Sequence, residues 1–276
     1  MENYQRTTWR VIEQPPDKGA WNMAVDEAIL ESVYSGNSLP TLRLYAWKPA
    51  CLSLGHAQPF DEVDGPELAA HGWDLVRRPT GGRAILHVDE LTYAVIAPES
   101  DPRVQGGVLD SYLRLSEALL EALHILGLNP EAQQQTTKRS EEKPNPVCFE
   151  VPSNYEITVN GKKLIGSAQA RRKEGILQHG ALPLYGDLTR IITALKYSDE
   201  AERNQARERL LNHATTVEQE LGIVYDWQVV SDAFKQAFET VLNLNLHPDF
   251  LTKKEKLRAY ELIQQKYANP TWTERI

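Results

Sequence analysis

The 276-residue sequence predicts an α+β fold, in which helices flank a mixed and largely antiparallel β-sheet. Strand-like segments dominate the first two-thirds of the chain, where tight hairpins alternate with helices, and this favours a mixed sheet over a doubly wound one. The last third is helical in pattern. Hydrophobic residues make up 41% of the chain, enough for a sizeable core. We therefore expect a single domain over residues 1–276, with a helical portion at about 187–276.

The N-terminal part of the chain predicts two helices among short strands. Ala20–Tyr34 is predicted to be helical because its apolar residues recur at helical spacing, and Gly36 can end the helix. A shorter helix is expected over Asp64–Gly72. Apolar or alternating segments predict strands at Trp9–Ile12, Thr41–Ala46, Cys51–Gly55, Asp74–Arg77 and Leu91–Ile96.

The central part contains a clear helix and then a polar stretch. Tyr112–Leu126 places leucines on one side of a helix, with Gly127 as its end signal. Residues 131–146 are rich in Gln, Lys and Glu. We interpret this stretch as a loop that leads to Cys148.

Two consecutive hairpins are predicted after this loop. Tyr155–Val159 alternates like a strand and meets Asn160-Gly161, which is the strongest short hairpin signal. The return strand is Lys163–Arg171, and a second turn leads to a strand at Ile176–Leu184. Helical signals follow at a capping box over Thr215–Glu218, at a helix beginning after Asp226 and at a last helix over Lys253–Tyr267.

Composition disfavours several classes of protein. The net charge of −8 disfavours a general nucleic-acid binder, and no apolar run reaches the roughly 18 residues of a membrane span. The N-terminus has no apolar signal stretch, and the two cysteines form no disulfide framework, so we expect a cytoplasmic protein with reduced thiols. The histidines are scattered and have no paired Cys/His spacing, which makes a metal site unexpected.

The segment Arg77–Arg83 is a candidate binding loop because it follows a predicted strand. Its paired glycines allow a backbone to pass close to a ligand and expose N–H groups. The flanking arginines can bind a phosphate or a carbonyl oxygen. An ordinary Gly-Gly turn with solvated arginines explains the same pattern. The segment is not a P-loop, because no Gly-Lys-Ser/Thr follows at the required spacing.

Cys148 is a candidate nucleophile. It follows the long polar stretch and lies between Pro146 and Pro152, which is a poor setting for a core residue and a good one for a positioned reactive group. A buried structural thiol is the alternative interpretation. A free cysteine is only a few per cent thiolate at pH 7, so a nearby cation is expected to assist it.

Lysines and histidines supply further candidates. Lys163 and its neighbour Lys162 follow the hairpin turn, and strand alternation places their side chains on opposite faces. Two solvated turn lysines are the simpler interpretation. His87 and His179 can each be a base, a structural hydrogen-bonding group or a surface residue.

Three motifs resemble the biotin/lipoate A/B protein ligase family over Trp9 to about Leu184. They are Arg-Arg-x-Thr-Gly-Gly-Arg-x-x-x-His ending at His87, Gly-Lys-Lys-x-x-Gly-Ser-Ala beginning at Gly161, and the pair His179-Gly180. Pro-Val-Cys-Phe-Glu around Cys148 is most similar to the ligase-like octanoyltransferases of that family. The resemblance implies that Cys148 and Lys163 are catalytic. It implies substrate-binding roles for Arg77, Arg78, Thr80, Gly81, Gly82, Arg83, His87, Gly166, Ser167, Ala168, His179 and Gly180.

The resemblance implies the fold of the ligase catalytic domain and a covalent acyl transfer. An octanoyl group would pass from an acyl carrier protein through a Cys148 thioester to a lysine of a lipoyl-domain protein, such as the glycine-cleavage H protein. No cofactor, nucleic acid or membrane partner is expected. The alternatives are an ATP-dependent lipoate ligase, an amidotransferase between lipoyl domains and an inactive carrier-binding module. Ligases usually have a third glycine where Arg83 stands, and they lack the cysteine.

Overall fold

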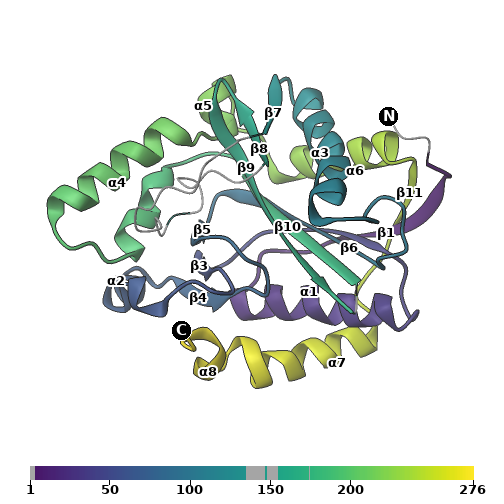
Figure 1. The fold of residues 1–276 in the computed structure, drawn as a ribbon, viewed down its shortest axis with the longest axis horizontal. Coiled ribbons are helices and arrows are strands. Elements are labelled where there is room, and N and C mark those ends of the chain that lie inside the picture. Colours follow the sequence, from purple (N-terminus) through teal and green to yellow (C-terminus); the bar gives the residue numbers. More distant parts are fainter. Residues whose placement is uncertain (1–3, 135–146, 148–154, 174) are drawn as a thin grey trace.

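The computed structural model describes residues 4–134, 147, 155–173 and 175–276 (Figure 1). Its main feature is an eight-stranded sheet. In spatial order the strands are β11 (Leu244–Pro248), β1 (Thr7–Glu13), β2 (Thr41–Tyr45), β6 (Glu90–Ala97), β10 (Gly175–Pro183), β9 (Lys162–Arg172), β8 (Tyr155–Val159) and β7 (Pro130–Gln134). Strand β1 runs parallel to both of its neighbours, and the remaining pairs are antiparallel. The predicted mixed, largely antiparallel sheet is confirmed.

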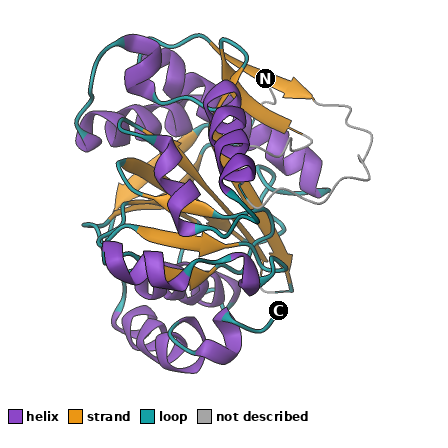
Figure 2. Cartoon of the chain, turned by 90° about the vertical axis from the view of Figure 1, so that its left-hand side faces the viewer, coloured by secondary structure: helices purple, strands orange, loops and turns teal. Residues whose placement is uncertain are grey.

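Helices cover both faces of this sheet, as Figures 1 and 2 show. On one face α1 (Gly19–Tyr34) and α7 (Lys253–Leu262) pack against the sheet, and a π-helical turn, η4 (Ile263–Tyr267), continues α7. On the other face lie α3 (Val108–Ile125) and α6 (Trp227–Val241). Because both faces are covered, the central strand β6 is buried at every position.

A smaller three-stranded sheet lies beside the large one. Its strands are β4 (Asp74–Arg77), β3 (Cys51–Leu54) and β5 (Ile85–His87), in that spatial order. Its apolar residues form a third core with neighbouring helices. The remaining helical elements are η1 (Phe60–Glu62), α2 (Gly65–His71), η3 (Leu188–Ala194), α4 (Glu200–His213), α5 (Val217–Leu221) and α8 (Pro270–Thr273).

The predicted hairpin forms at the expected turn. Asn160 and Gly161 both adopt positive φ angles, 51° and 77°, as a two-residue hairpin turn of the mirror-image type requires. The turn joins β8 to β9, which at 11 residues is longer than predicted by one residue at each end. This hairpin brings the Gly-Ser-Ala motif into the centre of the molecule.

Several expectations from the sequence were wrong. The stretch from 131 does not begin as a loop, because β7 pairs with β8 at the sheet edge, where polar residues remain exposed. Strand β11 interrupts the helical last third and pairs with β1. Thr216, not Thr215, caps α5 by accepting a hydrogen bond from the Gln219 N–H. Among the described residues, no helix combines the length and apolarity needed to cross a bilayer.

Candidate active site

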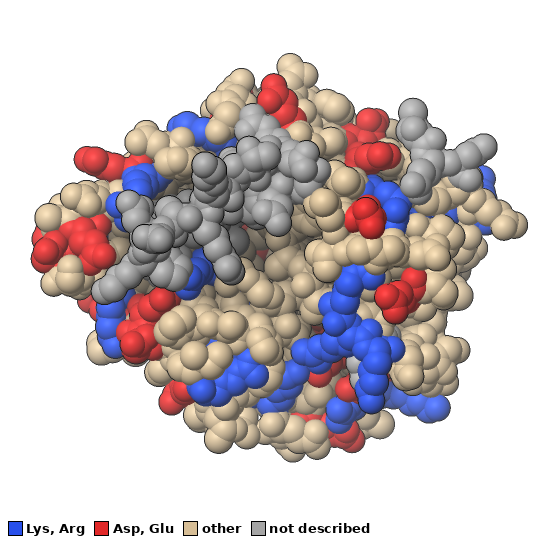
Figure 3. Space-filling view, viewed as in Figure 1, with Lys and Arg blue, Asp and Glu red and all other residues tan. Residues whose placement is uncertain are grey.

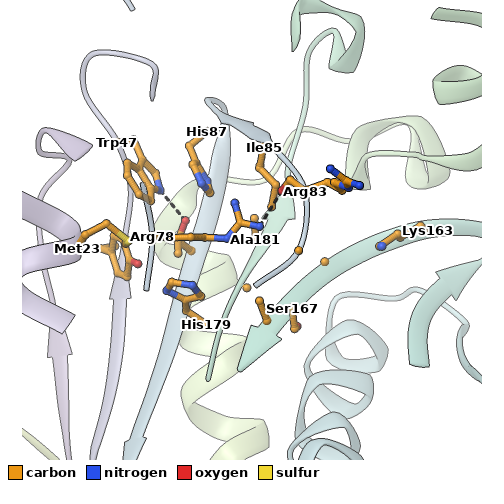
Figure 4. Close-up of a pocket in the computed structure, with 16 residues that line it drawn as sticks. Met23, Trp47, Arg78, Arg83, Ile85, His87, Lys163, Ser167, His179 and Ala181 are labelled. Atoms are coloured by element: carbon orange, nitrogen blue, oxygen red, sulfur yellow. Dashed lines mark hydrogen bonds between the residues drawn. The ribbon is translucent and has the colours of Figure 1, made fainter. Parts of the chain in front are cut away.

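A cavity of ≈ 240 Å³ lies where the loop after β4 meets strands β9 and β10 (Figure 4), and we call it the acyl cavity. Its wall contains many of the residues that the motifs indicated, namely Arg78, Gly82, Arg83, His87, Lys163, Gly166, Ser167, Ala168, His179 and Gly180. The other wall residues are Met23, Tyr45, Trp47, Ile85, Thr92 and Ala181. Segments far apart in the sequence therefore meet around one enclosed, largely apolar space.

The glycine loop is tied down by Arg78. The guanidinium donates to the carbonyl oxygens of Gly81 at 2.9 Å and Arg83 at 2.7 Å, and to the Ser53 hydroxyl at 3.0 Å. Gly82 adopts a φ of +91°, which favours glycine, and the bend lets its carbonyl approach Gly55 very closely. Arg78 therefore shapes the loop from inside the wall.

Arg77 lies outside the cavity wall. Its guanidinium donates to the carbonyl oxygens of Gln58 at 2.6 Å, Gly55 at 2.9 Å and Thr273 at 2.9 Å. These bonds join the turn after β3 to the C-terminal segment. The position of Arg77 is thus one of support, behind the glycine loop.

A buried hydrogen-bonded chain fixes His179 in the wall. Its Nδ1 lies 3.3 Å from Asp26 Oδ2, and its Nε2 lies 2.7 Å from the Thr80 hydroxyl. Asp26 also receives a bond from Arg43 at 2.6 Å and one from the Tyr45 hydroxyl at 3.1 Å. Burial alone would raise the pKa of Asp26, but the charge of Arg43 holds that pKa below its ordinary value. The chain connects α1 and β2 to the glycine loop, which Thr80 precedes.

Burial lowers the pKa of His179 below its ordinary value and outweighs the opposing effect of Asp26. The imidazole is therefore neutral at neutral pH. An ionised Asp26 can only accept, so His179 carries its proton on Nδ1 and its Nε2 accepts from the Thr80 hydroxyl. This arrangement orients Thr80, and through it the start of the glycine loop.

We expect His179 to make the free energy of unfolding fall as the pH drops below about 6.5. The unfolded histidine gains a proton there before the folded one does, because the folded pKa is depressed. Stability is thus present above the unfolded pKa and lost below it. His179→Gln should flatten this dependence by up to about 1.4 kcal/mol per pH unit. Urea unfolding at several pH values measures the slope. The exposed His124→Gln serves as control, and equal slopes in the two variants would contradict a buried neutral imidazole.

His87 has partners on both ring nitrogens. Its Nε2 lies 2.8 Å from the Ser53 hydroxyl, and its Nδ1 lies 2.7 Å from Glu90 Oε1. The ring stacks on Trp47 with centroids 4.0 Å apart. The arrangement gives the acyl cavity a flat, rigid side formed by an indole and an imidazole, with the polar edges of His87 directed into hydrogen bonds.

Lys163 lies in the wall as half of a buried ion pair. Its Nζ is 2.9 Å from Glu156 Oε1 on β8, and the two side chains are 4% and 7% exposed. Lys162 points to the other face of the hairpin, where its Nζ donates to the Leu211 carbonyl on α4 at 2.8 Å. The alternation expected from the sequence is therefore present, with Lys163 at the cavity and Lys162 away from it.

Ser167 and Gly180 form the part of the wall where β9 and β10 run side by side. The Ser167 hydroxyl lies 2.7 Å from the Tyr93 hydroxyl. A Cβ atom on Gly180 would come within 2.6 to 2.7 Å of Ser167, Gly166 and Tyr93, which real side chains do not tolerate. Burial raises the pKa of Tyr93 to about 12, so this hydroxyl keeps its proton. Glycine at position 180 thus keeps the cavity open.

Cys148 lies outside the described residues. Its described neighbour in the sequence, Val147, is buried and forms a parallel β-bridge with Ala84. Ala84 stands between Arg83 and Ile85, both of which belong to the cavity wall. The described residues contain no cluster of three or more His, Cys, Asp or Glu side chains arranged to hold a metal ion.

The sequence did not identify several residues at the cavity. Asp26, Tyr45 and Glu156 supply buried partners for the site residues, and Trp47 forms the stacking surface. A charged residue inside the apolar pattern of α1 was the one visible signal for Asp26. For the others no local signal exists, because their roles depend on contacts between distant segments.

Comparison with known proteins supports the motif-based resemblance. The family model of the lipoyl protein ligase A/B catalytic domain matches residues 18–239. Octanoyltransferase LipM of Moorella thermoacetica is 40% identical over 269 residues, covering 97% of this chain and 98% of that protein. Octanoyltransferase LipM of Bacillus subtilis is 38% identical over 273 residues, with coverage of 97% and 98%.

Solved structures agree with this assignment. The bipartite lipoate protein ligase of Thermoplasma acidophilum has a TM-score of 0.80 at 26% identity, covering 98% of this chain and 97% of that one. A lipoate-protein ligase A bound with ATP has a TM-score of 0.77 at 27% identity, with coverage of 97% and 98%. By sequence along nearly its whole length and by fold, the chain belongs to the lipoyl protein ligase A/B catalytic-domain family.

Proposed function

We propose that this protein is an octanoyltransferase of lipoate biosynthesis. It takes an octanoyl group from an acyl carrier protein, holds it as a thioester on Cys148 and transfers it to a lysine of a lipoyl-domain protein of the glycine-cleavage H type. The observation that supports this most strongly is the identity of 33–40% to octanoyltransferases over almost the whole chain. The enclosed, largely apolar cavity at the motif residues suits a medium-length acyl tail.

The proposed reaction consists of two exchanges at one carbonyl carbon. The Cys148 thiolate attacks the donor thioester, and the carrier thiol leaves with the proton that the cysteine lost. The neutral amine of the acceptor lysine then attacks the enzyme thioester, forms an amide, and releases the Cys148 thiol. The first step exchanges one thioester for another, and the second is downhill. Neither step requires ATP.

The acyl cavity supplies binding energy for the tail. Each buried methylene contributes about 0.8 kcal/mol, so the seven carbons beyond the carbonyl contribute about 5 kcal/mol. Trp47, Met23 and Ile85 provide apolar wall surface. Backbone N–H groups near Gly81-Gly82 or Gly166-Ser167 are the candidate donors to the oxyanion. In this proposal residues 1–276 act as one acyltransferase domain.

Lys163→Met is expected to slow acyl capture by about 10- to 100-fold, because losing a charge-assisted contact costs about 1.5–3 kcal/mol. The lysine charge would stabilise the thiolate and the developing oxyanion. Lys162→Met is the matched control on the opposite face and should remain within a few-fold of the parent protein. Stopped-flow acylation with octanoyl carrier protein measures the rate.

A double variant separates this role from a structural one. Lys163→Met alone leaves the buried Glu156 carboxylate without the lysine ammonium. Adding Glu156→Gln removes that charge. If the double variant regains the parent rate, Lys163 only maintains the fold and the catalytic assignment is wrong. If it stays slow while its unfolding temperature recovers, the lysine charge acts in the reaction.

An ATP-dependent lipoate ligase is the second candidate, because the chain shares the fold of a lipoate-protein ligase A that binds ATP. Arg83 stands where ligases usually have a glycine, and this difference favours the transferase. We expect that ATP and magnesium do not stimulate transfer to an apo lipoyl domain, and that free lipoate or octanoate is not used. Pyrophosphate release that depends on free lipoate would reverse the order of the two candidates.

A further inference from the structure

A second and more open cavity adjoins the acyl cavity. It measures ≈ 560 Å³, and we call it the basic cavity. Gly82 and Arg83 belong to the walls of both cavities. The tip of the glycine loop therefore separates an enclosed apolar space from an open one. A ligand lying across this loop would contact both.

The basic cavity is bordered by arginines from separate parts of the chain. Arg171 and Arg172 come from the end of β9, and Arg83 comes from the glycine loop. Arg275, near the C-terminus, donates to the His56 carbonyl at 2.7 Å at the cavity rim. Figure 3 shows Lys and Arg side chains gathered over this end of the β9–β10 hairpin. The concentration is notable on a chain with a net charge of −8.

Nearby carboxylates neutralise these arginines only in part. The nearest carboxylate oxygens lie 3.5 Å from Arg172, 3.6 Å from Arg171 and 3.7 Å from Arg83, in Glu27, Glu99 and Glu62. These are distances of loose ion pairs and exceed those of charge-assisted hydrogen bonds. Glu27 is in addition bound at 2.6 Å by Lys266. The arginines thus retain capacity for a further anion.

His56 reports the positive potential inside the basic cavity. Burial lowers its pKa, and the charges of Arg275, Arg172, Arg77 and Lys266 lower it further. Arg171 has an Nη1 nitrogen that is buried and makes no hydrogen bond within the described part of the chain. A cavity with such a potential and with arginine donors has the chemistry of a phosphate site.

We propose that the basic cavity binds the phosphate of the donor's phosphopantetheine arm while the thioester end of the same arm enters the acyl cavity. An acyl carrier protein presents its acyl group on such an arm, in which a phosphate and a thioester lie at opposite ends of a flexible, amide-containing chain. The proposal rests on the proposed function. The open cavity faces the solvent side from which a carrier would approach, and the enclosed one takes the tail.

A pair of donors that differ in one group tests this site. Octanoyl-phosphopantetheine and octanoyl-pantetheine carry the same thioester, and the first alone carries the phosphate. We expect the kcat/KM for acylation to be about 10-fold or more higher with the phosphate, through KM. Arg172→Gln should bring the ratio of the two values close to 1. Arg207→Gln on α4, away from both cavities, should keep the parent ratio.

Other arms separate the remaining explanations. Arg83→Gln provides a second variant if Arg172→Gln unfolds, and it should also lower the ratio. If the parent protein acylates equally fast with both donors, the phosphate site is wrong while the proposed function stands. If neither thioester acylates it, the proposed function itself fails. If ATP competes with the phosphorylated donor and supports adenylate formation from free lipoate, the basic cavity is a nucleotide site and this inference is overturned.

Discussion

Replacing Cys148 with alanine is expected to abolish acyl capture and to lower the transfer rate at least about 10³-fold, because no other group can accept the octanoyl group covalently in the proposed mechanism. The parent protein, mixed with octanoyl carrier protein alone, should gain the mass of one octanoyl group. Peptide mapping should place that group on Cys148. The alanine variant should gain none.

The second cysteine provides the control for this experiment. Cys51 is buried in the core of β3, and burial raises the pKa of its thiol well above the ordinary value. Cys51→Ala should therefore acylate at the parent rate and gain the same mass. Unchanged transfer by Cys148→Ala would exclude a covalent route through this residue. An octanoyl group found on Cys51 would move the nucleophile to the other thiol.

Asp26→Ala is expected to lower the free energy of unfolding by about 3–5 kcal/mol, because it leaves the buried Arg43 charge without its carboxylate. The Arg43 side chain is fully buried and lies 2.6 Å from Asp26. The same substitution removes the acceptor that orients His179, so the start of the glycine loop should also loosen. Urea unfolding monitored by tryptophan fluorescence gives the free energy.

Two comparisons make the Asp26 result interpretable. Adding Arg43→Met removes the orphaned charge and should restore much of the lost stability. The exposed pair Glu200–Arg203 is the matched control, and Glu200→Ala should cost about 1 kcal/mol or less. If Asp26→Ala costs no more than Glu200→Ala, the buried network contributes little to the fold.

Elements governed by local chemistry were predictable from the sequence. The Asn160-Gly161 turn formed as expected because few residue pairs accept two positive φ angles. Strand β4 has the predicted bounds, and α1 begins one residue earlier than predicted. The α3 helix begins four residues before the predicted start, since the Asp110 carboxylate accepts the Gly107 N–H and caps it.

Elements governed by distant pairing were not predictable. Strands β7 and β11 lie at the two edges of the large sheet, where one side of the strand has no partner and polar residues are tolerated. Neither shows the alternation that marked the inner strands. Strand β11 exists because Leu244 aligns with Thr7 at the other end of the chain, a pairing that no local window contains.

The sequence alone determined the family, the mixed sheet and the choice of Lys163 over Lys162, because motif spacing and strand alternation are written along the chain. Only the tertiary structure decided how the charged groups are satisfied. A buried charge requires a partner within hydrogen-bond distance, and for Lys163 and His179 that partner is Glu156 on the next strand and Asp26 on a distant helix. Packing of distant segments decides such pairs. It also decided that one glycine loop separates an apolar cavity from a basic one.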